Sequence, residues 1–173
     1  GLACKRIITS DSGGPFLGDK LYYNTFSLLL RTMNFFMYRI KTAQMIQHVY
    51  TNVTERPIAY YSLGWKLERC LSGFVKNMLA GNIPEPVIRH HNFPPAYLAD
   101  MKRHTREITD FISSKVGYAD IIARGLKPEE WAAAKNTGTN LTRLSAKRVD
   151  LLIRHAEDLT ELQVKLYCPD LIP

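Results

Sequence analysis

The sequence predicts an all-α fold, a single-domain helical bundle of four main helices with shorter helical segments between them. Three observations lead to this prediction. Apolar residues recur at steps of three and four, prolines and glycines separate these stretches, and no stretch alternates between apolar and polar residues as a half-buried strand does. The length of 173 residues fits one domain. We expect the bundle to span residues 20–167, between an extended, irregular N-terminal arm over 1–19 and a short C-terminal tail over 168–173.

The helix predicted from Tyr22 to Tyr50 is the element around which we expect the bundle to form. Asp19 is a candidate cap at its start. Alternating steps of four and three place seven residues on one stripe, which consists of Tyr22, Phe26, Leu29, Met33, Phe36, Ile40 and Ala43. The residues that we predict at the centre of the core are Leu29, Met33, Phe36 and Ile40. A rotated stripe is polar and basic, with Arg31, Asn34, Tyr38, Lys41 and His48.

Prolines and glycines delimit the remaining elements, because proline begins a helix readily but interrupts its interior, and glycine often ends one. The predicted elements are a helix over 57–79 that stops at Gly81, a stiff non-helical connector over 82–95, a helix over 95–116 with Gly117 as its C-cap, short helices over 118–123 and 128–135, and a last helix over 140–167. In the last helix we predict that Leu144, Val149 and Leu159 face the core. Its charged stripe, which includes Asp158 and Glu161, is predicted to face solvent.

The charge is distributed unevenly along the chain. The net charge is +7, and residues 1–106 carry 14 basic and 6 acidic side chains, whereas residues 107–173 carry 9 and 10. Such an asymmetry indicates a polyanionic partner, most plausibly nucleic acid, whose phosphates lysine and arginine neutralise. The residues predicted to bind it are Arg31, Arg39, Lys41, Arg89, Lys102, Arg103 and Arg106. Tyrosines lie among them in the sequence, and exposed aromatic rings can stack on unpaired bases.

No pattern in the sequence predicts a catalytic, cofactor or metal site. The run Asp11-Ser12-Gly13-Gly14-Pro15 resembles the nucleophilic serine region of trypsin-like proteases, but in that family the histidine and aspartate of the triad come earlier in the chain, and only ten residues precede Asp11. Cys4, Cys70 and Cys168 have no paired spacing. His90 and His91 lack further ligands at metal-binding spacing. A phosphate-binding glycine loop is also missing from the sequence. We therefore predict a non-enzymatic protein without a cofactor.

The preferred interpretation is a structural subunit that binds nucleic acid, such as a coat protein, a nucleoprotein or a ribonucleoprotein component. Protein neighbours would contact its N-terminal arm and C-terminal tail. One alternative is a helical accessory subunit of an organellar membrane complex. Another is a secreted helical signalling protein, which two N-glycosylation tripeptides at Asn52 and Asn140 and the lack of an initiator methionine would favour. No membrane span is predicted, because Arg31 and Asn34 interrupt the most hydrophobic window. The compartment stays open.

Overall fold

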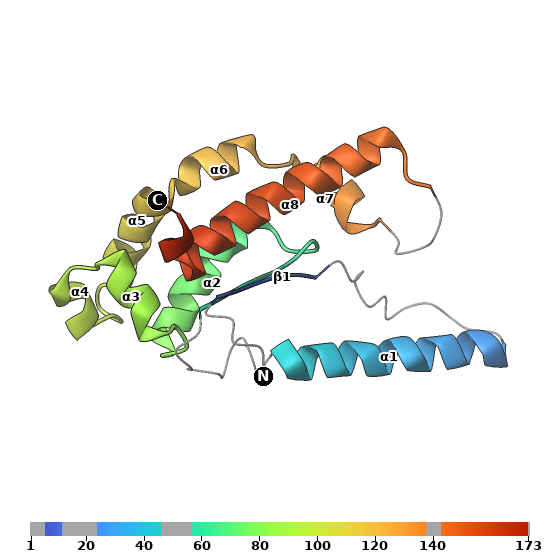
Figure 1. The fold of residues 1–173 in the computed structure, drawn as a ribbon, viewed down its shortest axis with the longest axis horizontal. Helices are drawn as coiled ribbons and strands as arrows, with labels where there is room; N and C mark the ends of the chain where they lie inside the picture. The colour runs from blue at the N-terminus through green and yellow to red at the C-terminus, as the bar shows by residue number, and fades with distance from the viewer. Residues whose placement is uncertain (1–5, 12–23, 46–56, 138–142, 173) are drawn as a thin grey trace.

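The computed structural model describes residues 6–11, 24–45, 57–137 and 143–172. This part of the chain is mostly helical, with eight α-helices and a small two-stranded parallel sheet (Figure 1). In chain order the elements are β1 (Ile7–Asp11), α1 (Thr25–Met45), β2 (Ile58–Ser62), α2 (Leu67–Leu79), α3 (Glu85–His91), α4 (Pro95–Ala99), α5 (Thr105–Val116), α6 (Tyr118–Arg124), α7 (Pro128–Lys135), α8 (Ala146–Tyr167) and a final 3₁₀ helix (Pro169–Leu171).

The sheet corrects the all-α prediction. β1 and β2 run parallel, with Ile7 opposite Ile58 and Asp11 opposite Ser62. The helix predicted from residue 57 therefore begins only at Leu67, after a strand. Three of the five residues in each strand are β-branched or aromatic, and such residues favour an extended chain. Parallel strands need a long crossover, so these two lie far apart in sequence and lack the turn that announces a hairpin.

The first described residues belong to the body of the fold, which corrects the prediction of an irregular arm at residues 7–11. Arg6 Nε donates hydrogen bonds to both carboxylate oxygens of Asp170, at 2.9 and 2.7 Å. The Tyr60 hydroxyl donates to Asp11 Oδ2 at 3.0 Å, and Leu63 N donates to Asp11 O at 3.1 Å. Contacts within the same chain therefore hold this segment in place, and its position is not evidence for a protein neighbour.

The core lies where α2, α5 and α8 meet, with β2 packed against α8. Its fully buried members include Phe74, Ile108, Ile112, Leu159 and Leu162. They recur at helical spacing within each helix, which is why each helix presents an apolar face to the others. Thr160 adds a polar contact where β2 packs against α8. Its Oγ1 donates to the Ala156 carbonyl oxygen at 2.6 Å and lies 2.8 Å from the Tyr61 hydroxyl oxygen.

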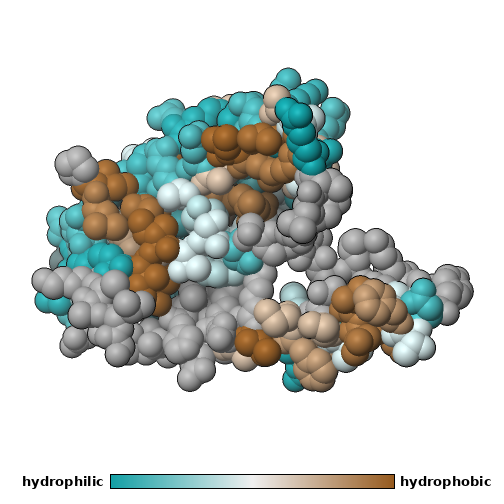
Figure 2. All heavy atoms as spheres, turned by 45° about the vertical axis from the view of Figure 1, so that its right-hand side comes forward, coloured by the Kyte–Doolittle hydropathy of each residue, from teal (hydrophilic) through white to brown (hydrophobic). Residues whose placement is uncertain are grey.

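The predicted central helix is not in this core. α1 forms as a helix, with Asn24 as its cap, because Ser27 N donates to Asn24 Oδ1 at 2.7 Å. The four residues predicted at the centre of the core are all exposed, namely Leu29, Met33, Phe36 and Ile40. Figure 1 shows α1 lying apart from the other helices, and Figure 2 shows apolar (brown) atoms along this projecting part. Periodicity shows which residues share a helix face, but it does not say whether the same chain covers that face.

None of the described helices is both long enough and apolar enough to cross a lipid bilayer.

Prolines and glycines in the sequence predicted several helix boundaries correctly. α7 has the predicted bounds, with Pro128 in its first turn, and Gly117 ends α5 in the left-handed region at φ 65°. Two predictions were wrong. The connector over 82–95 contains α3, because Pro86 lies in the first turn, where its missing N–H is not needed. The helix over 95–116 is divided into α4 and α5 at Asp100, whose side chain accepts a hydrogen bond from Arg103 N at 3.2 Å and forms a turn.

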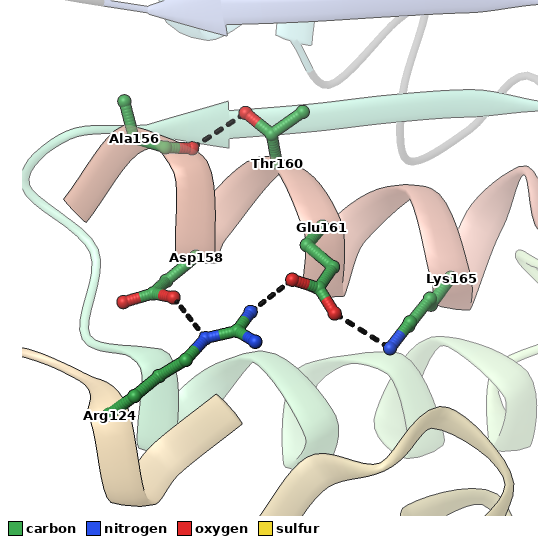
Figure 3. Close-up of polar contacts among 6 residues, drawn as sticks. All are labelled: Arg124, Ala156, Asp158, Thr160, Glu161 and Lys165. Atoms are coloured by element: carbon green, nitrogen blue, oxygen red, sulfur yellow. Dashed lines mark hydrogen bonds and ion pairs between the residues drawn. The ribbon is translucent and has the colours of Figure 1, made fainter. Parts of the chain in front are cut away.

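A charged network joins α6 to α8 and corrects the solvated stripe predicted for α8 (Figure 3). Arg124 Nε donates to Asp158 Oδ1 at 2.8 Å, and Arg124 also pairs with Glu161. Lys165 Nζ lies 2.7 Å from the other carboxylate oxygen of Glu161. The Asp158 side chain is 8% exposed, so it is buried rather than solvated. The prediction is also wrong for Leu144 and Val149, which are exposed. The fold thus turns α8 so that part of its charged stripe faces α6.

Two buried histidines pack inside the fold. His91 Nε2 is 2.8 Å from the Leu166 carbonyl oxygen, and His155 Nε2 is 3.1 Å from that of Trp65, so each ring donates from Nε2. Their Nδ1 atoms have no hydrogen-bond partner within the described residues. Burial lowers the pKa of both imidazoles below the ordinary value of 6.5.

We expect the unfolding free energy to fall as the pH drops below about 6.5, because protons then bind the unfolded histidines more strongly than the folded ones. The stabilisation is fully present above pH 6.5, the pKa of the unfolded groups, and is lost as the pH falls towards the folded pKa values. Urea unfolding at a series of pH values measures this dependence. His91→Gln should flatten it, whereas His90→Gln, at the exposed neighbouring position, should not. An equal slope in both variants would contradict the assignment to His91.

Candidate nucleic-acid interface

A basic groove runs along α2 and reaches α7. Its volume is about 800 Å³, and it is open to solvent. The residues that line it are Gly64, Trp65, Lys66, Arg69, Cys70, Gly73, Lys76, Asn77, Asn82, Trp131, Lys135, Gln163 and Tyr167. We call this surface the α2 groove.

The sequence of α2 explains how the α2 groove forms. Lys66, Arg69, Gly73 and Lys76 recur at steps of three and four, which places them along one side of the helix. Most residues of α2 that are buried in the core lie on a different side, namely Leu67, Leu71, Phe74, Val75 and Met78, and the buried Cys70 lies between the two sides, where it also lines the groove. α2 therefore presents an apolar face to the core and a basic row to solvent.

The α2 groove is strongly electropositive. Lys66, Arg69, Lys76 and Lys135 line it, and no acidic residue does. In the part of the chain that the structure describes, none of the four cations forms an ion pair. By contrast, Arg124 and Lys165 elsewhere on the surface both pair with the carboxylate of Glu161. Unneutralised cations gathered in one concave surface attract an anionic ligand.

Both tryptophans of the chain lie in the α2 groove. Trp131 Nε1 donates to the Trp65 carbonyl oxygen at 3.1 Å, and His155 Nε2 donates to the same oxygen. These two bonds fix the loop before α2 against α7 and α8. Lys66 and Lys135 place their ammonium groups 4.6 and 4.9 Å from the centre of the Trp131 ring, which is cation–π distance. Aromatic faces and cations are thus held side by side.

Gly73 leaves room in the middle of the α2 groove. A Cβ atom added at this glycine would meet no heavy atom within 4 Å. Glycine inside a helix destabilises it by about 1 kcal/mol relative to alanine. No packing contact in the described fold requires this glycine, so its effect is to keep the helix backbone accessible from the groove.

The α2 groove also contains a thiol, that of Cys70. Burial raises the pKa of the Cys70 thiol to about 11, so the thiol stays protonated at neutral pH and is a poor nucleophile. Among the described residues no three histidine, cysteine, aspartate or glutamate side chains converge in a way that could hold a metal ion. The α2 groove offers charge, aromatic surface and space, which are the properties of a binding site.

The structure distributes the site residues predicted from sequence over three segments. Arg31, Arg39 and Lys41 belong to α1, where the Arg39 guanidinium lies 5.9 Å from the centre of the Phe35 ring. Arg89 is on α3, and its Nε lies 3.6 Å from a carboxylate oxygen of Glu85.

The other three predicted residues lie around the start of α5. Lys102 and Arg103 are exposed in the turn before it, and Arg106 Nε on α5 lies 3.9 Å from Asp110 Oδ2. None of the seven predicted residues lines the α2 groove.

Sequence reasoning missed the four cations of the α2 groove. The spacing of Lys66, Arg69 and Lys76 was a usable signal, because it marks one side of a helix. Lys135 and Trp131 carried no such signal, since α7 reaches α2 only through the tertiary fold. The asparagines of the two N-glycosylation tripeptides, Asn52 and Asn140, lie outside the described residues, as do the proposed cap Asp19 and the serine of the protease-like run.

No protein-family model matches this chain, and no curated protein or solved structure is significantly similar to it. The function is therefore inferred from the geometry of the groove.

Proposed function

We propose that this protein is a non-enzymatic helical subunit that binds single-stranded nucleic acid in the α2 groove. The observation that supports this most is the meeting of four unneutralised cations with both tryptophans of the chain. Lysine and arginine bind phosphates, and tryptophan rings stack on unpaired bases. A small anion would contact the cations but would have no base to stack on the tryptophan rings.

The length of the basic row favours a polymer over a single phosphate. Lys66 and Lys76 are ten residues apart, so the row extends about 15 Å at the helical rise of about 1.5 Å per residue. One phosphate group contacts only part of such a row, whereas a strand can lie along it. A strand would bring phosphates to Lys66, Arg69 and Lys76 and a base to Trp131, where the nucleotide replaces the lysine contacts with the ring.

Titration with a single-stranded RNA oligonucleotide is expected to quench the intrinsic tryptophan fluorescence. Both tryptophans line the α2 groove, so the signal reports on this surface directly. Quenching should weaken as salt increases, because phosphate contacts release counterions. A duplex of the same sequence should quench less, since its bases are already stacked.

Gly73→Leu provides a matched test of the site. The new side chain points into open space, so the fold should be as stable as before or more so, while the filled groove loses affinity. Circular dichroism controls for folding. Binding without any change in fluorescence, or binding that Gly73→Leu leaves intact, would show that RNA lies elsewhere on the molecule.

A further inference from the structure

α1 carries a continuous apolar face that the described chain leaves uncovered. At least 46% of each of seven side chains on this face is exposed, namely Phe26, Leu29, Leu30, Met33, Phe36, Met37 and Ile40. They recur at steps of three and four and so form a broad stripe along about four turns. Figure 2 shows apolar atoms on this projecting helix. An exposed apolar patch of this extent marks a contact surface.

The described chain covers α1 only slightly on any side. Among the α1 side chains that the structure describes, the half-buried ones are Ser27, Arg31 and Thr42, which lie on the side opposite Met33. Phe26 and Met37 on the apolar face are 70% and 64% exposed. Leu28 and Phe35, on the side opposite Met33, are also 55% and 43% exposed, so the described chain covers little of α1 and leaves its apolar face open to an external partner.

The charge of α1 identifies the chemistry of that partner. The helix contains Arg31, Arg39 and Lys41 and no acidic residue. Helices that pair with other helices commonly use opposite charges beside the apolar seam to select their partner. If Phe26 and Met33 are placed on the seam, the flanking positions hold threonine, leucine and methionine, with Arg39 as the one charge. Two copies of α1 would bring like charges together.

We propose that α1 lies on the surface of an anionic lipid bilayer, with its apolar face in the interfacial region and Arg39 at the lipid headgroups. A basic helix with large apolar side chains on one side has the composition of an interfacial helix. Each cation near an anionic leaflet strengthens binding, and the flanking position of Arg39 lets its guanidinium reach the headgroups. None of the residues that line the α2 groove belongs to α1, so this surface is separate from the proposed nucleic-acid site.

Flotation of the full chain with vesicles tests the proposal. The protein should float with vesicles of phosphatidylcholine and phosphatidylglycerol at a ratio of about 3:1, and much less with phosphatidylcholine alone. Leu29→Ser combined with Phe36→Ser should reduce vesicle binding about tenfold or more, because two large side chains leave the interface. Arg39→Gln should weaken binding to the anionic vesicles only. Both changes fall on exposed residues, so circular dichroism should be unchanged.

Ile153→Ser is the matched control, since Ile153 is also an exposed apolar residue but lies on α8. It should leave vesicle binding unchanged, and the α1 variants should keep the RNA affinity of the unmodified protein. Equal vesicle binding by the α1 double variant would overturn the proposal. So would α1-dependent self-association in sedimentation velocity without vesicle binding, which would make this face an interface between copies. Loss of vesicle binding in Gly73→Leu but not in the α1 variants would assign lipid to the α2 groove instead.

Discussion

Changing Lys66, Arg69 and Lys76 together to glutamine is expected to weaken binding of single-stranded RNA about 100-fold at about 0.1 M salt. These residues form the basic row of the α2 groove and have no carboxylate partner among the described residues. Each lost phosphate contact lowers the slope of log K against log[salt] by about 0.7, so three contacts lower it by about 2. Fluorescence anisotropy across a salt series measures both the affinity and the slope.

The matched control changes Lys102, Arg103 and Arg106 to glutamine, which removes the same net charge from the surface around α5. These residues were the sequence-based candidates, so the two triple variants compare the two placements of the site. We expect a small effect from the control, because Asp110 lies close to Arg106 and none of the three residues lines the α2 groove. A larger effect from the control than from the groove variant would assign binding to the cluster. Equal effects would mean that only net charge matters.

Phe74→Ala is expected to lower the unfolding free energy by about 3–5 kcal/mol. The ring is fully buried between α2, α3 and α8, with its centre 5.5 Å from that of His91 and 5.2 Å from that of Tyr167. Its removal leaves a cavity that these aromatic neighbours cannot fill without leaving their own contacts. Urea unfolding followed by circular dichroism gives the value.

Phe36→Ala is the same chemical change on α1, where the ring is 59% exposed. We expect a loss below about 0.5 kcal/mol, in the range of ordinary surface substitutions. A large loss for Phe36 with a small one for Phe74 would restore the core predicted from the sequence.

The ends of several helices were predictable, whereas the strands and the packing of the helices were not. Pro128 and Gly117 determine helix ends through their own backbone preferences, and the sequence placed both boundaries correctly. The pairing of Ile7 with Ile58 depends on two segments far apart in the chain, and neither one shows the alternation of a half-buried strand. The face of α1 was read correctly as a stripe but was assigned to the interior, because amphipathicity does not distinguish a core face from an external contact surface.

In the candidate site, one part could be predicted from the sequence and the other could not. The spacing of Lys66, Arg69 and Lys76 can be read directly from the sequence, because one helix carries all three. The other wall, with Trp131 and Lys135, is added by α7, which packs against α8. A pattern search along the chain finds the row but not the groove, and counting charges in each part of the chain directed attention to α1 and α5 instead.

The parallel pairing of β1 and β2 has a consequence for the time course of folding. Strand β1 is synthesised before α1, and its partner β2 follows only after the whole crossover, while the α8 surface that supports β2 comes later still. The ion pair of Arg6 with Asp170 joins residues 164 positions apart. Contacts this distant require large loops to close first, so folding should proceed in milliseconds to seconds rather than in the microseconds of a simple helical bundle. During synthesis, β1 would wait unpaired until β2 had emerged, and the pair would lack the support of α8 until nearly the whole described chain had been made.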